Sequence, residues 1–155
     1  MKIGLIADSH DNVPSVNKMT EVFTKIPINA VIHAGDYVAP FTIRRLLNQK
    51  WDFYGIFGNN DGEKEGLLKL APQLVEGPVI FEVGGINIGV VHDREQWNDQ
   101  PCDLLLFGHT HQCFYKEVDG RIEINPGELC GWLYGKSTVA VFDTETKDAE
   151  IIEVL

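Results

Sequence analysis

The sequence predicts an α/β fold in which two β-sheets pack together. Up to residue 74, apolar strands alternate with amphipathic helices, which is typical of parallel β-α-β units. After Pro78 the pattern changes to short strands joined by glycine-centred turns, which favours antiparallel hairpins. No linker, repeat or low-complexity segment divides the 155 residues, so we expect a single domain spanning residues 1–155.

The first half predicts three buried strands, over residues 2–8, 29–36 and 51–61. A first helix is predicted over residues 13–26, where apolar residues are spaced by three or four: Val13, Val16, Met19, Val22, Phe23 and Ile26. Two shorter helices are predicted over residues 40–50 and 63–74, the first of them opened by Pro40. Strands alternating with helices in this way are expected to be parallel and joined by right-handed crossovers.

The second half predicts three hairpins and one further buried strand. Residues 79–93 form two strands around the Gly84-Gly85 pair, and residues 103–109 form an isolated apolar strand. Residues 112–127 turn at Asp119-Gly120, and residues 137–155 turn near residues 144–147. We therefore expect a mostly antiparallel second half.

Composition and charge exclude several classes of protein. No stretch approaches the ~20 apolar residues that a membrane span requires, and the N-terminal apolar run stops at Asp8, too soon for a secretory signal. Three cysteines without paired spacing indicate free thiols in a reducing compartment, so we expect a cytoplasmic protein. Cys113 and Cys130 are expected to be small buried hydrophobic residues. The net charge of -10 disfavours a wide nucleic-acid surface, although bound cations could reverse the sign locally.

Polar residues follow the apolar strands at five places. They occur in the segments ADSH, AGD, GNND, VVHD and GHTH, and they are Asp8, His10, Asp36, Asn59, His92, His109 and His111. Any one of them is explained as well by a helix cap, a turn or a structural histidine. Seven at the same ends of separate strands are not, because such strand ends line the ligand crevice of α/β sheets. His33, inside the strand VIHAGD, is expected in the core or behind the site.

The residue types and spacing indicate bound metal. In DSH and HTH, residues two apart point the same way if the backbone is extended, so both could face one ion. Mixed nitrogen and oxygen ligands favour Mn, Fe, Ni or Zn over Ca or Mg alone. Seven ligands are too many for one tetrahedral ion and suit two ions that share a carboxylate. No cysteine belongs to the set, which disfavours a structural zinc knot.

The ordered series Asp-x-His, Gly-Asp, Gly-Asn-x-Asp, His, Gly-His-x-His resembles the calcineurin-like metallophosphoesterase family nearly end to end. The short length and the segment NPGELCG resemble its small single-domain bacterial and archaeal phosphodiesterases. The resemblance implies a four-layer α-β-β-α sandwich of two mixed sheets flanked by helices. It also implies that one metal is bound by Asp8, His10 and His111, that the other is bound by Asn59, His92 and His109, and that Asp36 bridges them.

The resemblance implies a phosphodiesterase in which two divalent metals and a bridging hydroxide attack a small phosphodiester. Asp36, Asn59 and His109 are the residues expected to take part in catalysis, and Mn or Ni are the expected metals, with Fe, Zn or Mg as alternatives. Two other functions stay open: a phosphomonoesterase acting on a small nucleotide or sugar phosphate, and a protein-binding scaffold like the retromer subunit of the same fold. A homo-oligomer is compatible with the sequence.

Three residues depart from the family pattern. Asn60 occupies the place of a histidine found in the larger phosphatases, and Asp11 and Asp93 stand where glycine is frequent. The identity of a general acid is therefore open. Asn12 and Arg94 are candidate substrate contacts, with solvated surface as the preferred interpretation of Arg94.

Overall fold

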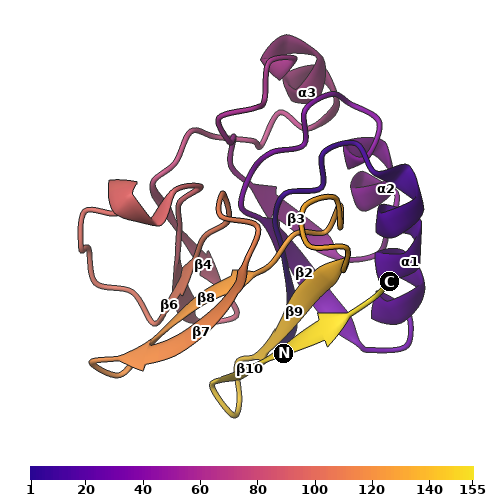
Figure 1. Ribbon diagram of the computed structural model, residues 1–155. Helices are drawn as coiled ribbons and strands as arrows, with labels where there is room; N and C mark the ends of the chain where they lie inside the picture. Colours follow the sequence, from indigo (N-terminus) through magenta and orange to yellow (C-terminus); the bar gives the residue numbers. More distant parts are fainter.

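A computed structural model describes residues 1–155 and contains two five-stranded sheets packed face to face (Figure 1). The first sheet has the order β10 (Asp148–Glu153), β9 (Thr138–Asp143), β1 (Lys2–Ile6), β2 (Ile28–His33) and β3 (Asp52–Gly55). The second has the order β4 (Val79–Val83), β5 (Ile86–Val90), β6 (Leu104–Leu106), β8 (Arg121–Pro126) and β7 (Cys113–Val118). The α/β sandwich is confirmed, with both sheets mixed.

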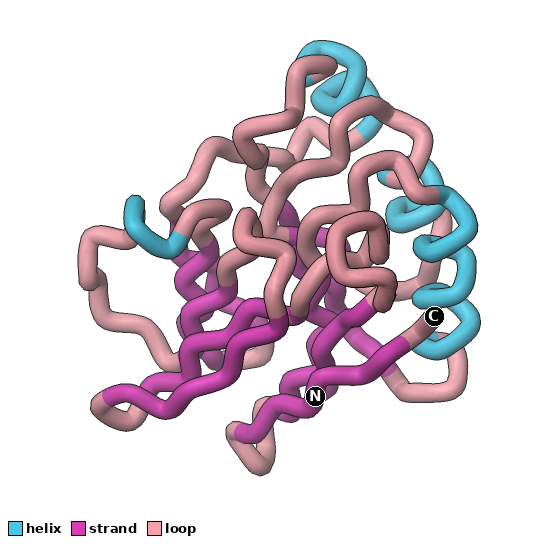
Figure 2. Tube along the Cα trace, in the orientation of Figure 1, coloured by secondary structure: helices cyan, strands magenta, loops and turns pink.

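Helices cover the outer face of the first sheet (Figures 1 and 2). α1 (Val13–Phe23) and α2 (Ile43–Leu47) lie against this face, and α3 (Lys64–Leu70) lies above the loops at the strand ends, where its Leu67 joins the same apolar cluster. The outer face of the second sheet is covered only by the single 3-10 turn η1 (Arg94–Gln96) and its flanking loop, through Trp97. The fourth layer is therefore thin. All of the helices are too short or too polar to cross a membrane.

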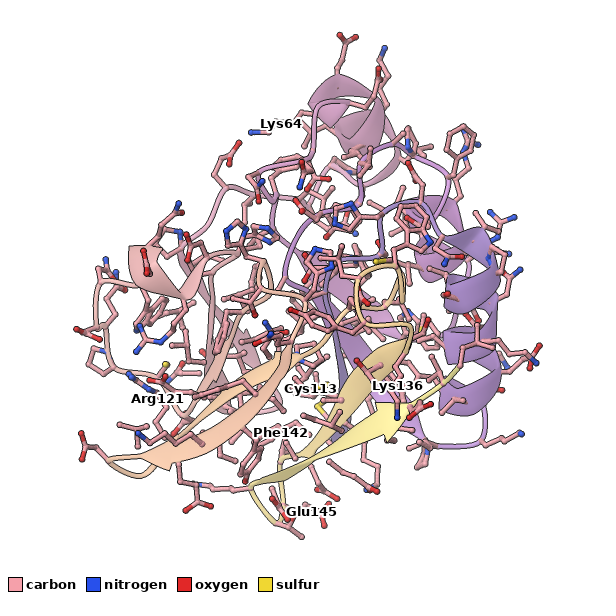
Figure 3. The ribbon with its side chains drawn as sticks, viewed as in Figure 1. Lys64, Cys113, Arg121, Lys136, Phe142 and Glu145 are labelled. Atoms are coloured by element: carbon pink, nitrogen blue, oxygen red, sulfur yellow. The ribbon has the colours of Figure 1, made fainter.

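Alternation along the strands separates the two apolar layers. Ile3 and Leu5 of β1 face the second sheet within a cluster of 17 buried residues, whereas Ile6 faces the helices. Phe142 of β9 lies in the same cluster between the sheets (Figure 3). Gly4 leaves room for a helix side chain, because a Cβ there would lie 2.4 Å from Cε2 of Phe23. Each fully buried aliphatic side chain stabilises the packing by about 1.5–3 kcal/mol.

Strand pairing agrees with the prediction in the first half and differs in the second. β1, β2 and β3 are parallel, as predicted. The three hairpins are antiparallel, but β5, β6 and β8 run parallel at the centre of the second sheet, which was not predicted. The connection that carries η1 crosses the outer face between β5 and β6, and such a crossover permits parallel pairing. The last hairpin joins the first sheet, with β9 antiparallel to β1.

One buried carboxylate ties together the loops that follow β2 and β3. Oδ2 of Asp61 accepts the backbone N–H groups of Asp36 at 3.0 Å and Gly58 at 2.7 Å, and Oδ1 accepts that of Val38 at 2.7 Å. Asp61 is buried, so no bulk water replaces these bonds. The positions of two neighbouring strand ends therefore depend on one side chain.

Substitution of Asp61 by alanine should lower the free energy of unfolding by about 3 kcal/mol or more. Each of the three N–H donors would lose its acceptor, and an unsatisfied buried donor costs roughly 1–3 kcal/mol. Urea unfolding of the metal-free protein measures this, with Asp61→Asn expected to lie between the alanine variant and wild type. Glu65→Ala, which removes only an exposed ion pair with Lys69, is the control. A loss under 1 kcal/mol for Asp61→Ala would contradict the role.

Candidate metal centre

Four of the predicted side chains converge in one group at the carboxyl ends of β1 and β2. The group contains Asp8, His10, Asp36 and His111, whose potential ligand atoms all lie within 4.8 Å of one another. Nε2 of His10 lies 3.3 Å from Oδ2 of Asp36 and 4.0 Å from Oδ1 of Asp8, and Nε2 of His111 lies 3.7 Å from the same Oδ1. Donor atoms at such separations suit a cation about 2 Å from each of them.

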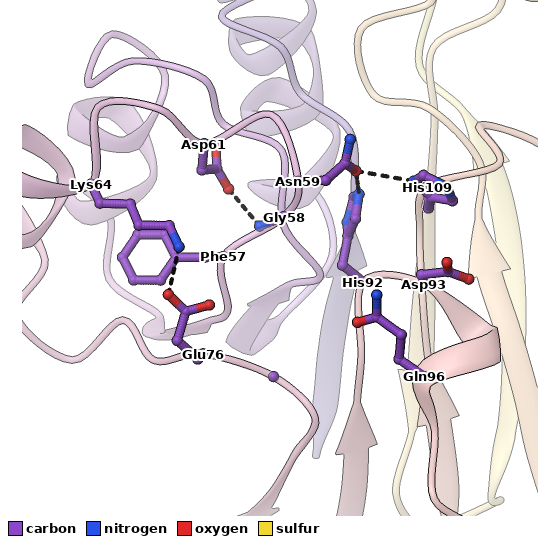
Figure 4. A pocket seen from close by; sticks show the side chains of 11 residues that line it. Phe57, Gly58, Asn59, Asp61, Lys64, Glu76, His92, Asp93, Gln96 and His109 are labelled. Atoms are coloured by element: carbon purple, nitrogen blue, oxygen red, sulfur yellow. Dashed lines mark hydrogen bonds and ion pairs between the residues drawn. The ribbon is translucent and has the colours of Figure 1, made fainter.

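A second group lies on the other side of Asp36. Oδ1 of Asn59 lies 2.8 Å from Nε2 of His92 and 3.0 Å from Nδ1 of His109 (Figure 4). Nε2 of His92 is also 3.5 Å from Oδ1 of Asp36. The two oxygens of Asp36 therefore face different imidazole groups, Oδ2 towards His10 and Oδ1 towards His92.

Lone pairs converge in both groups. Nδ1–H of His92 donates to the backbone oxygen of Ala34 at 2.8 Å, so in a neutral ring Nε2 carries a lone pair that faces the amide oxygen of Asn59. In the first group, Oδ1 of Asp8 and Nε2 of His10 are buried without any hydrogen-bond partner. Buried polar atoms normally have partners. A bound divalent cation would satisfy both the lone pairs that face each other in the second group and the atoms without hydrogen-bond partners in the first.

The carboxylate of Asp36 remains ionised although it is buried. Burial by itself would raise the pKa of Asp36, but the close approach of the His10 and His92 imidazoles holds that pKa well below its ordinary value. Burial lowers the pKa of His10 and of His92, and contact with Asp36 outweighs it, so both imidazole pKa values are raised. At Asp8, by contrast, burial outweighs the opposing effects of His92 and His111 and raises the pKa of the carboxyl to about 6.

The backbone conformation of the predicted ligands differs from our expectation. The extended backbone assumed for DSH and HTH is wrong, because His10, His109 and His111 all have positive φ, at 38°, 67° and 62°. Asp8 and Asp36 are also left-handed, with φ of 50° and 64°. Residues other than glycine adopt this left-handed backbone conformation at a cost in free energy, and such strained residues cluster at functional sites. Sharp turns, rather than strand alternation, aim these side chains inward.

Glycine at position 58 is required by the close approach of Asp36. A Cβ on Gly58 would lie 2.2 Å from Oδ1 and 2.9 Å from Cγ of Asp36. The backbone of GNND can therefore pass directly beside the carboxylate only without a side chain at this position.

Asn60 and His33 both hold parts of the centre in place. The backbone N–H of Asn60 donates to Oδ1 of Asp36 at 2.9 Å, and its amide Nδ2 donates to Oδ2 at 2.7 Å. His33 is buried behind the site, as predicted; its Nδ1 accepts from Gly35 N–H, so Nε2–H donates to the hydroxyl of Ser9. Burial lowers the pKa of His33 to about 3, which keeps it neutral.

The four other polar residues singled out in the sequence have structural partners. Asp11 accepts from the backbone of Ala39, and Asp93 caps η1 by accepting from Glu95. Asn12 caps α1 through Ser15 N–H, and Arg94 forms a two-fold ion pair with Glu123, at 2.9 and 3.0 Å. Arg94 is therefore an ion-pair partner rather than solvated surface.

Glu128 is a buried residue that the sequence did not single out for a role. Its Oε2 accepts from Nδ1 of His111 at 2.8 Å, which directs Nε2 of that ring towards Asp8. The only sequence signal was its place in NPGELCG. A carboxylate behind a histidine is the usual way to fix the tautomer and orientation of a metal-binding imidazole.

A cleft of about 370 Å³ opens beside the second group (Figure 4). Asn59, His92 and His109 line one side, and Lys64 lies on the other. The ammonium of Lys64 is paired with Glu76 at 2.6 Å and lies 5.1 Å from the centre of the Phe57 ring. The remaining charged lining is acidic, so the cleft has little free positive charge from side chains.

The three cysteines are free, as predicted. Cys130 is buried, and burial raises its thiol pKa to about 12. The expectation of burial is wrong for Cys113, which is exposed because β7 is an edge strand with both faces partly open.

Comparison with known proteins agrees with this geometry. The model of the calcineurin-like phosphoesterase superfamily domain matches residues 1–147. The chain is 34% identical to the phosphodiesterase MJ0936 of Methanocaldococcus jannaschii over 159 aligned positions, which cover 96% of each protein.

Solved structures show the same fold. An archaeal phosphodiesterase superposes with a TM-score of 0.88 at 33% identity, over 99% of both chains. Vacuolar protein sorting 29 from Cryptosporidium parvum superposes with a TM-score of 0.69 at 19% identity, over 98% of this chain and 95% of that one, which shows the fold alone. The domain match and the similarity over nearly the whole chain place this protein in the calcineurin-like phosphoesterase superfamily.

Proposed function

We propose that this protein is a divalent-metal-dependent phosphodiesterase acting on a small phosphodiester. The observation that carries the proposal is that the two oxygens of Asp36 face two separate groups of nitrogen and oxygen donors. Similarity to a phosphodiesterase over 96% of both proteins supports the reaction type. Membership of the phosphoesterase superfamily supports divalent metal ions as the cofactors.

Our assignment is two ions, one held by Asp8, His10 and His111 and the other by Asn59, His92 and His109, with Asp36 between them. Mn or Ni suit these mixed donors best, and Fe, Zn or Mg are compatible. When bound, such a pair of ions polarises phosphoryl oxygens and acidifies water for in-line attack on phosphorus. Asp36, Asn59 and His109 are the residues that we assign to catalysis.

The chain itself orients the donor atoms. The backbone oxygen of Ala34 accepts a hydrogen bond from Nδ1 of His92, and Glu128 accepts one from Nδ1 of His111, which leaves the Nε2 lone pairs of both rings directed into the site. Asn60 donates to both oxygens of Asp36 and so limits rotation of that carboxylate. Preorganised donors of this kind lower the cost of reaching the reactive geometry.

Charge favours a diester over a monoester. The one lysine of the cleft is paired with Glu76, so Asp93 and the buried Asp61 are the acidic lining residues without a basic partner. A dianionic monoester is repelled more strongly by this lining than a monoanionic diester. Asn60, unlike histidine, has no acidic form that could protonate a leaving alkoxide at neutral pH. Both features support diester hydrolysis.

Two further proposals concern organisation and location. Free thiols support a cytoplasmic location. The family match over residues 1–147 supports a single domain across residues 1–155.

Turnover of a panel of phosphate esters with Mn, Ni, Mg and Zn tests the function. We expect diesters to be hydrolysed with at least one of these metals. Stoichiometric metal binding without turnover of any ester would favour a protein-binding role instead, and turnover confined to monoesters would favour a phosphomonoesterase.

Protein reconstituted with Mn should hold about two ions per chain, as two-metal sites do. Elemental analysis after removal of free metal measures this. Asp93→Asn, which changes a carboxylate that caps η1, serves as the control and should retain both ions. One ion or fewer at saturating Mn would overturn the dinuclear assignment.

Asp36→Asn should lower kcat/KM for a diester by at least about 100-fold and weaken binding of both ions, since we assign Asp36 to both. The asparagine keeps the shape of the side chain and removes its charge. The control, Asp93→Asn, also removes one negative charge, from the lining of the neighbouring cleft. Equal losses in the two variants would show that only the overall charge matters.

Wild-type protein should hydrolyse bis(p-nitrophenyl) phosphate faster than p-nitrophenyl phosphate, compared as kcat/KM at matched metal and pH. Asn60→His should lower this ratio roughly tenfold, because an imidazolium beside the site attracts a dianionic monoester more strongly than a monoanionic diester. The attraction between two unit charges at this range is on the order of 1–4 kcal/mol.

The control for this variant is Asn60→Ala, which also removes the hydrogen bond from the side-chain amide to Asp36 but adds no imidazole. Its ratio should stay at the wild-type value even if both rates fall. A wild-type preference for the monoester, or equal ratios in the histidine and alanine variants, would show that residue 60 does not determine the preference.

A further inference from the structure

The loop between β8 and β9, whose course is seen in Figure 1, contains three consecutive large side chains that are exposed to solvent. Trp132, Leu133 and Tyr134 are 63%, 68% and 52% exposed. Gly131 and Gly135 flank them, both with positive φ, at 68° and 73°. Large apolar side chains gathered on a surface are unfavourable in water and commonly mark a binding site.

This loop is attached to the candidate metal centre. The buried carboxylate of Glu128 accepts the backbone N–H of Leu133 at 3.0 Å and that of Tyr134 at 2.7 Å, while it also accepts from His111. The side-chain amide of Gln112, the next residue along from His111, donates to the hydroxyl of Tyr134 at 2.7 Å. The exposed side chains are therefore held at a definite place relative to the GHTH segment.

Trp132 lies directly beside the first metal-ligand group. Its ring centre is 6.1 Å from that of His10, and the ring of His10 is 5.1 Å from that of His111. An organic group attached to phosphorus at this centre would reach the indole. The nearby Lys136 is paired with Glu153 at 2.9 Å, so this loop offers aromatic and aliphatic surface rather than free charge.

We propose that Trp132, Leu133 and Tyr134 form a platform that binds a planar aromatic substituent of the phosphodiester, such as a nucleobase. The inference rests on the proposed function and narrows its substrate class to nucleoside or aryl diesters. A diester has two organic groups. The cleft with Lys64 and Gln96 offers a polar wall to one of them, and the platform on the other side of Asp36 offers stacking to the other.

The size of the platform favours a small ligand over a protein partner. A stable protein–protein interface buries about 800 Å² of accessible surface on each partner. Three side chains of one loop, each already partly buried, offer much less, since a large aromatic residue contributes at most about 150–250 Å². Stacking of one base on an aromatic side chain needs only the area of a ring.

The test compares two diesters with the same leaving group, thymidine 5′-(p-nitrophenyl phosphate) and methyl p-nitrophenyl phosphate. Wild type should prefer the thymidine ester in kcat/KM. Trp132→Ala should lower the thymidine-to-methyl ratio by about tenfold, since stacking on one aromatic side chain affects binding by roughly 5- to 160-fold. Trp132→Phe should retain part of the preference. Tyr115→Ala, an exposed tyrosine on β7 whose hydroxyl donates to Asp148, is the control and should keep the wild-type ratio.

Tryptophan fluorescence gives a measurement independent of turnover. Trp97 is buried and Trp51 is partly buried, so Trp132 is the most exposed of the three tryptophans. Adenosine 5′-monophosphate added to the Mn-loaded protein should quench its emission, and the quenching should be absent in Trp132→Phe. A ratio within twofold of wild type in Trp132→Ala, with hydrolysis of both esters intact, would overturn the platform. If neither ester is hydrolysed by wild type, the phosphodiesterase proposal fails, and the fluorescence result alone decides the platform.

Discussion

The buried carboxylate of Asp36 is the constraint on which the rest of the site depends. A charge removed from water is costly unless it is paired and hydrogen-bonded. Here the side chains of His10, His92 and Asn60 surround it, and Asp61 holds its backbone N–H. Because each oxygen faces a different donor group, every strand that contributes to the site must end at the same carboxylate.

The sandwich provides these converging strand ends. Loops after β1, β2 and β3 of the first sheet carry Asp8, Asp36 and Asn59, and loops after β5 and β6 of the second carry His92 and His109. The apolar cluster between the sheets sets their relative position, since close-packed interiors tolerate little displacement. The geometry of the polar centre therefore depends on apolar side chains that take no part in its chemistry.

The left-handed turns at the strand ends are stabilised by hydrogen bonds between segments far apart in the chain. The N–H of Asp8 donates to the oxygen of Gly35, that of His10 donates to the oxygen of Asp36, and that of His109 donates to the carboxylate of Asp8. A left-handed residue costs about 1–2 kcal/mol, which bonds of this kind can offset. The cost falls on the residues that carry the chemistry, and the surrounding contacts keep them in place.

The sequence by itself determined the fold class, the parallel first half and the seven polar residues that meet at the centre, because apolar periodicity and the residue that ends a strand are local signals. Only the tertiary structure decided that the last hairpin joins the first sheet and that β5, β6 and β8 are parallel. It also revealed the bonds of Glu128 with His111 and of Asp61 with the loop at Asp36. These are contacts between segments separated in the chain, and no local pattern of residues specifies which distant group a buried carboxylate will reach.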